Sequence, residues 1–217
     1  MTAPTGQPIA VLCDFDGTIT KGGVIELLYH AFAAPSCWEL VDRWIRGEIS
    51  TFEEIQGCFS TMKASREEME TILDRVEIDP GFLEFVDFCK GRGYLLAILS
   101  DGLRWYIDYV LTHHEICDLP IYANEIQFLE DGYRITTPWY SPQTPRRGVS
   151  KPGIIQNYRD MGYKVIFVGD GLSDIEAVNA ADLLYARDEL LEYCQKHGIS
   201  AIAFTNMRDL ISKWREE

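Results

Sequence analysis

The feature that most constrains this chain is an apolar run at residues 9–12 that leads into the segment CDFDGT at 13–18. A run that is apolar at every position is typical of a parallel-sheet strand buried on both faces. Asp14 and Asp16 follow it, and Gly17 lets the chain turn away. Open α/β sheets bind ligands beyond the carboxyl ends of their strands, so both carboxylates stand where chemistry is expected. A simple Asx turn would also explain an Asp-Gly pair, and only the rest of the chain separates the two interpretations.

Strand and helix signals alternate along most of the chain. This alternation predicts an α/β fold, with a parallel sheet in a three-layer α/β/α Rossmann-like core. Strands are expected at 94–99, 120–123, 164–168, 182–185 and 201–204, with a hairpin of 125–128 and 133–136 around Asp131-Gly132. Helices are expected from Asp79-Pro80, over 103–111, from Pro152 to about 161, over 172–180 and 188–197, and after Asn206.

Residues 21–78 show helical spacing of apolar residues and no strand signal. Pro35-Ser36 separates two helices, Ser50 opens a third with a capping-box pattern, and Ser65 marks the start of a fourth. We therefore predict a helical insert over 21–78, between core segments at 1–20 and 79–217.

Composition limits the partners of the chain. Of 217 residues, 34 are acidic and 20 basic, and the net charge of −14 disfavours nucleic acids and anionic membranes. No apolar run approaches the ~20 residues of a membrane span, and the polar segment 1–8 does not resemble a signal peptide. The six cysteines are scattered without a Cys-x-x-Cys pair, which predicts reduced thiols in a cytoplasmic protein rather than disulfides or a zinc site. A monomer and a homodimer both remain open.

Three further motifs follow the later strands. Ser100 comes after the strand at 94–99, Lys151 precedes a helix, and GDGLSD at 169–174 follows the strand at 164–168. Together with residues 14–18, these motifs resemble the four motifs of the haloacid dehalogenase-like phosphohydrolases. The resemblance spans nearly the whole chain, and it implies a Rossmann-like core with a type-one (C1) helical cap above the catalytic crevice.

The resemblance also implies a role for each motif. Asp14 would be the nucleophile that takes the phosphoryl group as an aspartyl-phosphate. Asp16 would be the general acid for the leaving alkoxide and then the base for the hydrolytic water. Ser100 and Lys151 would complete the catalytic set by binding the transferring oxygens. Asp101 and Gly102 are expected beside them in the substrate site, where Asp101 departs from the Ser-Gly-Gly pattern of the branch and adds a carboxylate.

Four aspartates at one sheet edge require cations. Two carboxylates ~4 Å apart repel by on the order of 4 kcal/mol at an effective dielectric constant of 20. Hard oxygen ligands favour Mg²⁺, and no His or Cys cluster among the motifs suggests zinc or copper. By the resemblance, Mg²⁺ would be held by Asp14, Asp16 (through its carbonyl) and Asp170, with Asp174 behind them holding Lys151 or a metal-bound water.

The helical insert and the 169–174 motif resemble the phosphoserine-phosphatase branch of the family. Its serine enzymes bind the amino acid with a Glu nine residues after the nucleophile and an Arg in the cap. Here Gly23 stands at the first position, leaving room instead of charge, and QGC at 56–58 surrounds the second. Phosphoserine is therefore expected to be a poor substrate.

The tail at 182–191, with Cys194, resembles instead the methionine-salvage phosphatases that act on hydroxy-keto-methylthiopentenyl phosphate. Aromatic residues of the insert would tolerate a thioether chain, although core packing also explains them. Arg146 and Arg147 are either a solvated pair or a substrate contact.

The predicted function is therefore a Mg²⁺-dependent phosphomonoesterase for a small-molecule phosphate ester, with phosphoserine phosphatase as the alternative. A haloacid dehalogenase would keep Asp14 but would not need Asp16, because a halide leaves without a proton. A receiver-like domain gathers similar residues, but it would have ~120 residues and no cap. The complete motif set argues against a non-catalytic phosphate-binding module.

Overall fold

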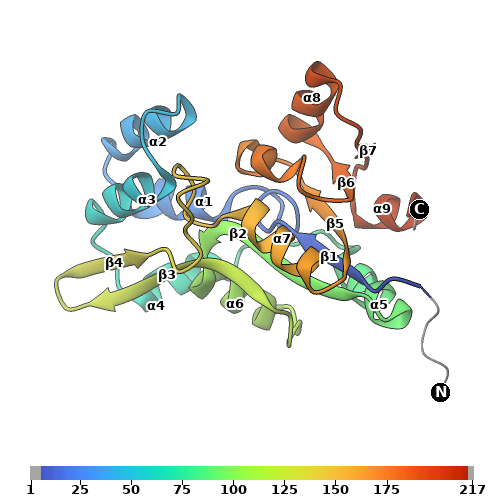
Figure 1. Ribbon diagram of the computed structural model, residues 1–217. Helices are drawn as coiled ribbons and strands as arrows, with labels where there is room; N and C mark the ends of the chain where they lie inside the picture. The colour runs from blue at the N-terminus through green and yellow to red at the C-terminus, as the bar shows by residue number, and fades with distance from the viewer. Residues whose placement is uncertain (1–5, 215–217) are drawn as a thin grey trace.

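The computed structural model describes residues 6–214. A seven-stranded sheet runs through its centre in the order β4-β3-β2-β1-β5-β6-β7 (Figure 1). All pairs of neighbouring strands in it are parallel except β3 with β4. The outer parts of the predicted core, 1–5 and 215–217, lie outside the described residues. The strands are β1 (Ile9–Cys13), β2 (Leu95–Leu103), β3 (Ile121–Leu129), β4 (Gly132–Thr136), β5 (Lys164–Gly169), β6 (Leu183–Ala186) and β7 (Ile202–Ala203).

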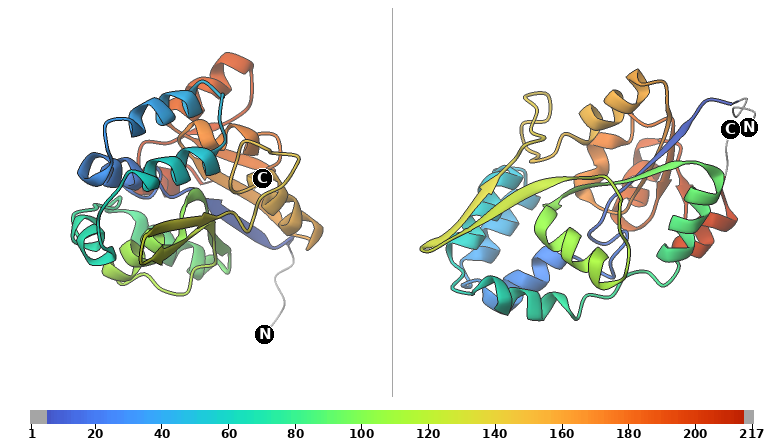
Figure 2. Two further views of the ribbon diagram at one scale, coloured as in Figure 1. Left: turned by 90° about the vertical axis from the view of Figure 1, so that its left-hand side faces the viewer. Right: turned by 90° about the horizontal axis from the view of Figure 1, so that it is seen from below.

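Helices cover both faces of the sheet, which confirms the predicted three-layer core (Figures 1 and 2). Alternation along β1 shows why: Val11 packs with the cluster that includes α5 and α9, and Leu12 packs with the cluster that includes α7 and α8. Both side chains are fully buried, as a two-sided parallel strand requires. These helices are α5 (Phe82–Arg92), α6 (Arg104–His113), α7 (Lys151–Asp160), α8 (Asp188–His197) and α9 (Met207–Ser212), with the 3₁₀ helix η1 (Leu172–Ala177).

The predicted helical insert is present between β1 and α5, and Figure 1 shows α1, α2 and α3 grouped at one end of the sheet. Ser50 and Ser65 each form a complete capping box, which confirms the helix starts read from the sequence. An isolated bridge between Thr20 and Ile78 joins the two ends of the insert. This bridge supports the boundaries 21 and 78, which remain a prediction. The helices are α1 (Val24–Phe32), α2 (Cys37–Ile45), α3 (Thr51–Ser60) and α4 (Arg66–Leu73).

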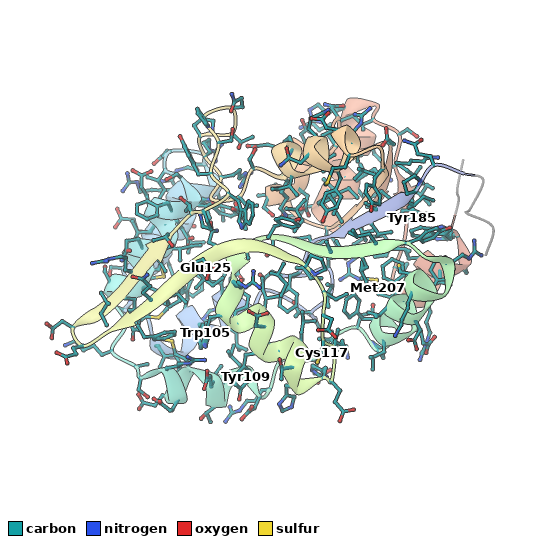
Figure 3. All side chains as sticks on the ribbon, turned by 60° about the horizontal axis from the view of Figure 1, so that its bottom comes forward. Trp105, Tyr109, Cys117, Glu125, Tyr185 and Met207 are labelled. Carbon is teal, nitrogen blue, oxygen red and sulfur yellow. A yellow bond between two sulfur atoms is a disulfide. The ribbon has the colours of Figure 1, made fainter. Side chains whose placement is uncertain are left out.

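Side chains of α6 tie the insert to the core. Figure 3 labels Trp105 and Tyr109 along α6. The Trp105 indole donates a hydrogen bond to Glu70 at 3.0 Å, and the Tyr109 hydroxyl donates one to Asp74 at 2.7 Å. Both acceptors belong to α4 or its C-terminal end. The insert is thus anchored on α6, the helix that follows β2.

Several predicted boundaries are wrong. Strand β2 continues to Leu103 instead of ending at 99, and the segments predicted at 120–123 and 125–128 form the single strand β3. Helix α5 begins at Phe82 rather than at Pro80. The cause is Asp79, whose carboxylate accepts hydrogen bonds from the backbone N–H groups of Gly81 and Met207 and so links α5 to α9. The helix predicted over 172–180 is the shorter 3₁₀ helix η1.

The prediction that the cysteines are unpaired is also wrong for one pair. Cys37, at the start of α2, forms a disulfide with Cys58 of α3. Packing of α2 against α3 brings together two cysteines that are 21 residues apart in the sequence. No short Cys motif predicts a pairing over that separation. The other cysteines are free, and Cys117 is the exposed one among them. Within residues 6–214, no helix is long and apolar enough to span a membrane.

The disulfide leads to a prediction for stability. A cross-link that closes a loop of this length is expected to stabilise the fold by about 3 kcal/mol. Reduction of the purified protein should therefore lower its melting temperature and raise its intact mass by two hydrogen atoms. A Cys58→Ser variant should melt at the same temperature with and without reductant. Unreduced protein whose mass already corresponds to six thiols would contradict this prediction.

Candidate active site

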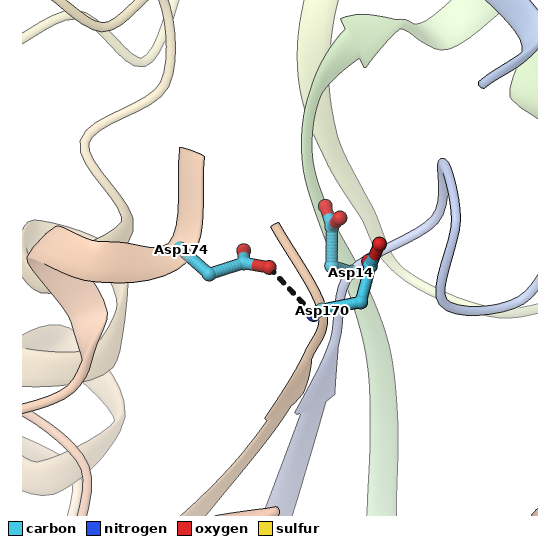
Figure 4. Close-up of side chains that lie close together, drawn as sticks. All are labelled: Asp14, Asp170 and Asp174. Carbon is cyan, nitrogen blue, oxygen red and sulfur yellow. Dashed lines mark hydrogen bonds between the residues drawn. The ribbon is translucent and has the colours of Figure 1, made fainter. Parts of the chain in front are cut away.

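Three carboxylates meet at the carboxyl ends of the two central strands. Asp14 follows β1, Asp170 follows β5, and Asp174 lies in η1 (Figure 4). One oxygen from each lies within 4.8 Å of the others. The backbone N–H of Asp14 donates to the carbonyl of Val168 at 2.9 Å, so the β1–β5 pairing itself sets where Asp14 stands. The structure therefore brings together the two acidic motifs that the sequence identified.

Lys151, the first residue of α7, is buried between two of these carboxylates. Its Nζ donates to Asp14 Oδ1 at 2.8 Å and to Asp174 Oδ1 at 2.5 Å. Burial alone would lower the pKa of the lysine, but the two carboxylates outweigh it and raise the pKa. The other Asp174 oxygen accepts the backbone N–H groups of Asp170 and Gly171, at 2.9 and 3.1 Å. Asp174 therefore orients both the Lys151 side chain and the backbone turn at Asp170-Gly171.

Two residues that sequence reasoning missed hold Asp170 and the turn after Asp16. Thr18 Oγ1 donates to Asp170 Oδ1 at 2.5 Å. Arg187, directly after β6, donates to the carbonyl of Gly17. Gly17 has a φ of +79°, and a Cβ on it would overlap the Asp170 carboxylate. The position of Arg187 at a strand's carboxyl end is a signal that could have identified it.

The charges of this cluster do not balance. Burial and the neighbouring Asp174 raise the pKa of Asp14 well above its usual range, although Lys151 opposes the shift. Burial, and again Asp174, raise the pKa of Asp170 to about 6. One lysine thus leaves excess negative charge on closely spaced, hard oxygen ligands. This donor set fits a divalent cation such as Mg²⁺.

Asp16 points away from the acidic cluster. Its Oδ2 accepts a hydrogen bond from the Tyr106 hydroxyl at 2.5 Å, and its Oδ1 accepts the Val24 N–H at 2.6 Å. Burial raises the pKa of Asp16 to about 7. Gly102 makes this arrangement possible, because a Cβ there would collide with the Tyr106 hydroxyl and lie 2.7 Å from Asp16 Oδ2. Tyr106 was missed because its helical spacing predicts only a core residue.

Ser100 and Asp101 lie near the end of β2 and line the cavity. The hydroxyl of Ser100 accepts the N–H of Gly102 at 3.0 Å. Asp101 Oδ1 accepts the N–H groups of Gly148 and Val149, each at 2.9 Å. Its Oδ2 accepts the hydroxyl of Thr51, on α3, at 2.8 Å. This geometry favours a positioning role that joins β2, the 137–150 segment and the insert, while direct substrate contact by Asp101 stays a prediction.

Arg146 and Arg147 attach the 137–150 segment to the insert. Arg146 donates to the Trp44 carbonyl at 3.0 Å, and the Arg147 guanidinium lies 5.6 Å from the Trp44 ring. The Trp44 indole in turn donates to Thr51 Oγ1 at 3.1 Å. Neither arginine lines the cavity, so the structure favours a docking role over substrate contact.

A cavity of about 440 Å³ lies between the strand ends and the insert. Among the described residues that line it, none is Lys, Arg or His. Motif residues form one wall. The wall from the insert consists of Gly22, Gly23, Ile25, Glu26, Tyr29, Val41, Trp44, Ile45, Thr51, Glu54 and Ile55.

The structure corrects one expectation about this wall. Gly23 does not leave empty space, because the Glu26 carboxylate lies where its Cβ would be. The expectation of room instead of charge at this position is therefore wrong. At the second position, Gln56 is turned to β4, where it binds the Tyr133 carbonyl and the Ile135 N–H. Among the described residues that line the cavity, no basic side chain takes the place of the cap Arg of the serine enzymes.

Comparisons with known proteins show which family the chain belongs to. The family model for haloacid dehalogenase-like hydrolase matches residues 11–179. A 2-hydroxy-3-keto-5-methylthiopentenyl-1-phosphate phosphatase from Brevibacillus brevis is 30% identical over 211 residues, which are 94% of each chain. The protein of the same name from Bacillus pumilus is 33% identical over 210 residues, covering 94% of this chain and 89% of the relative.

The fold also matches solved structures. A solved phosphoserine phosphatase with a phospho-aspartyl intermediate analogue superposes with a TM-score of 0.75, covering 97% of this chain and all of the other, at 17% identity. The structure places buried aspartates and a lysine at the carboxyl edge of a Rossmann-like sheet, and the family model and the curated relatives are those of hydrolases. The chain belongs to the haloacid dehalogenase-like hydrolases and is a phosphatase of that family.

The acidic wall of the insert predicts a pH-dependent stability. Burial, with Glu26 nearby, raises the pKa of Glu54 to about 8. The unfolded carboxyl ionises near pH 4.3, so its favourable contribution is complete below that pH and is lost as the pH rises to 8. Glu54→Gln should therefore gain stability relative to wild type by on the order of 3 kcal/mol between pH 5 and pH 8. Urea unfolding at both pH values measures this.

Glu192, on the exposed face of α8, offers the matched control. Glu192→Gln should track wild type at both pH values. A constant difference between Glu54→Gln and wild type from pH 5 to pH 8 would show that Glu54 is not a buried, protonated carboxyl.

Proposed function

We propose that this phosphatase is a Mg²⁺-dependent phosphomonoesterase that works through an aspartyl-phosphate on Asp14. The observation that carries the proposal is the pair of hydrogen bonds from buried Lys151 to Asp14 and Asp174. The lysine keeps one Asp14 oxygen fixed and supplies positive charge for the transferring phosphoryl oxygens. Ser100 faces the same cavity and would donate a further hydrogen bond to them.

Asp16 is placed to move the proton. Held by Tyr106 and Val24, and with a pKa of about 7, it can be protonated when an alkoxide leaves and ionised when water attacks the aspartyl-phosphate. Asp16 also lines the cavity between the strand ends and the insert, where the leaving group of a bound ester would lie.

The acidic cluster would hold Mg²⁺ through the carboxylates of Asp14 and Asp170 and the carbonyl of Asp16. When bound, the cation would neutralise charge on the phosphoryl group. Asp174 is engaged with Lys151 and two backbone N–H groups, which supports a place behind the ligands.

For the substrate we infer the hydroxy-keto-methylthiopentenyl phosphate of methionine salvage, the molecule in the names of the relatives. The apolar side chains of Val41, Ile45 and Ile55 in the cavity suit its thioether tail. No basic side chain of the described lining is present to pair with a second anionic group on the substrate. Phosphoserine is the second candidate, because the Glu26 carboxylate beside Gly23 could receive an ammonium group.

We also infer a cytoplasmic enzyme, monomer or homodimer, with a small-molecule partner and no nucleic acid or membrane partner. The net charge and the free cysteines support this inference. The Cys37–Cys58 disulfide is the observation against a reducing compartment.

Removal of the metal is the first test of this function. Excess EDTA should abolish hydrolysis of para-nitrophenyl phosphate, and Mg²⁺ should restore it. Because ligand binding to the folded state stabilises it, Mg²⁺ should also raise the melting temperature. Full activity in excess chelator would contradict the metal-dependent mechanism.

The leaving group tests Asp16. Asp16→Asn should lower kcat/KM for alkyl phosphates by ~10²–10⁴, because an alkoxide needs a proton to leave. The loss should be far smaller for para-nitrophenyl phosphate, whose phenolate leaves unaided. Steady-state kinetics on matched alkyl and aryl esters give the comparison, and equal losses on both would remove the general-acid role.

Substrate choice is tested by kcat/KM at saturating Mg²⁺. Phosphoserine should be poorer than the keto-enol phosphate by over ~100-fold, a misfit of ~3 kcal/mol, since its carboxylate would face Asp16 and Glu26 without a partner. Phosphoserine as the best substrate of a panel of phosphate esters would favour the second candidate instead.

A further inference from the structure

The wall of the cavity formed by the insert contains a buried phenol without a hydrogen-bond partner. Tyr29, on α1, is 1% exposed and lines the cavity. Within the described residues its hydroxyl has no hydrogen bond of regular geometry, although the Glu54 carboxyl interacts with it closely enough to add to the effect of burial, which raises the pKa of Tyr29. Buried hydroxyl groups are nearly always paired, because an unpaired one loses its interaction with water and gains nothing in return. A ligand in the cavity is the partner that this geometry lacks.

Glu54, on α3, lies beside that phenol. It is 6% exposed, lines the same cavity, and interacts with the Tyr29 hydroxyl strongly enough to affect the pKa of both groups. Burial raises both pKa values, so near neutral pH each side chain carries a proton on oxygen. The acidic residues Glu26, Asp16 and Asp101 lie near the pair. No Lys, Arg or His of the described lining compensates their negative charge.

We propose that Tyr29 and Glu54 form a recognition pair for an uncharged oxygen, a carbonyl or enol oxygen, on the leaving group of the phosphate ester. This inference rests on the proposed phosphomonoesterase function and adds the residues that select the substrate. The two side chains come from different helices of the insert and converge on the cavity opposite the strand ends that carry Asp14 and Asp170.

The donors and charges of the wall decide which group fits. Two O–H donors require an acceptor, and a carbonyl oxygen has two lone pairs to offer. An ammonium is only a donor, so it would leave the Tyr29 proton unpaired. A carboxylate would be repelled by Asp16 and Glu26. Val41, Ile45 and Ile55 line the same wall. The predicted substrate is therefore a phosphate ester whose leaving group carries an uncharged oxygen followed by an apolar chain.

Small phosphate esters isolate the contribution of this oxygen. Hydroxyacetone phosphate carries a ketone next to the ester carbon, 1-propyl phosphate lacks it, and phosphoethanolamine carries an ammonium instead. Wild type should have a kcat/KM for the ketone about tenfold or more above that for the propyl ester. Tyr29→Phe and Glu54→Leu should each bring this ratio close to one, whereas Glu54→Gln should keep most of it because an amide both donates and accepts.

Tyr109→Phe and Glu192→Gln are the matched controls. Tyr109 bonds to Asp74 outside the cavity and Glu192 is exposed on α8, so both variants should keep the wild-type ratio. The isosteric Tyr29→Phe and Glu54→Gln keep the experiment decisive should Glu54→Leu fail to fold.

The outcomes separate this inference from the proposed function. An unchanged ketone-to-propyl ratio in both Tyr29→Phe and Glu54→Leu would overturn the pair while leaving the phosphatase intact. Preference for phosphoethanolamine that disappears in Glu54→Gln would overturn it in favour of an ionised Glu54 that binds ammonium. No hydrolysis of any ester by wild type, or undiminished hydrolysis by Asp14→Asn, would contradict the proposed function itself.

Discussion

The buried ammonium of Lys151 is the interaction on which the rest of the site depends. It stands in the first turn of α7, where the helix dipole disfavours a cation, and it has almost no access to water. The carboxylates of Asp14 and Asp174 offset both costs. Removal of one partner from a buried ion pair typically costs 3–5 kcal/mol, because the other charge is left alone. The same contacts connect α7, the end of β1 and η1. The ion pairs that stabilise the fold here are therefore also the ones that position the acidic residues of the site.

A second set of contacts holds the insert above this edge. Asp101 receives hydrogen bonds from the 137–150 segment and from Thr51, and the latter also accepts from Trp44. Arg146 and Arg147 both contact the same tryptophan. These contacts fix helix α3 of the insert relative to β2 and to the 137–150 segment. In the proposed function, this polar network would hold the insert's wall of the cavity above the strand ends.

The convergence of the acidic motifs at one sheet edge could be predicted from the sequence, but the contacts of the insert could not. Asp14 and Asp170 follow parallel strands and Ser100 lies near the end of a third, and such strand ends must meet at one edge of a sheet. The pairing of Cys37 with Cys58 and the Asp101 network depend on how distant segments pack. Packing between distant segments leaves no period or motif in the sequence. The tightly held Asp16–Tyr106 pair shows the same limit, because helical spacing marks Tyr106 only as core.

The most direct test of the account is to trap the covalent intermediate. Asp16→Asn should still form an aspartyl-phosphate from para-nitrophenyl phosphate, but without its base it should hydrolyse the intermediate slowly and accumulate it. Acid quenching followed by peptide mass spectrometry should find the phosphoryl group on Asp14. The added mass should be absent from the double variant that also carries Asp14→Asn. A phosphoryl group on another residue, or none during active turnover, would contradict nucleophilic catalysis by Asp14.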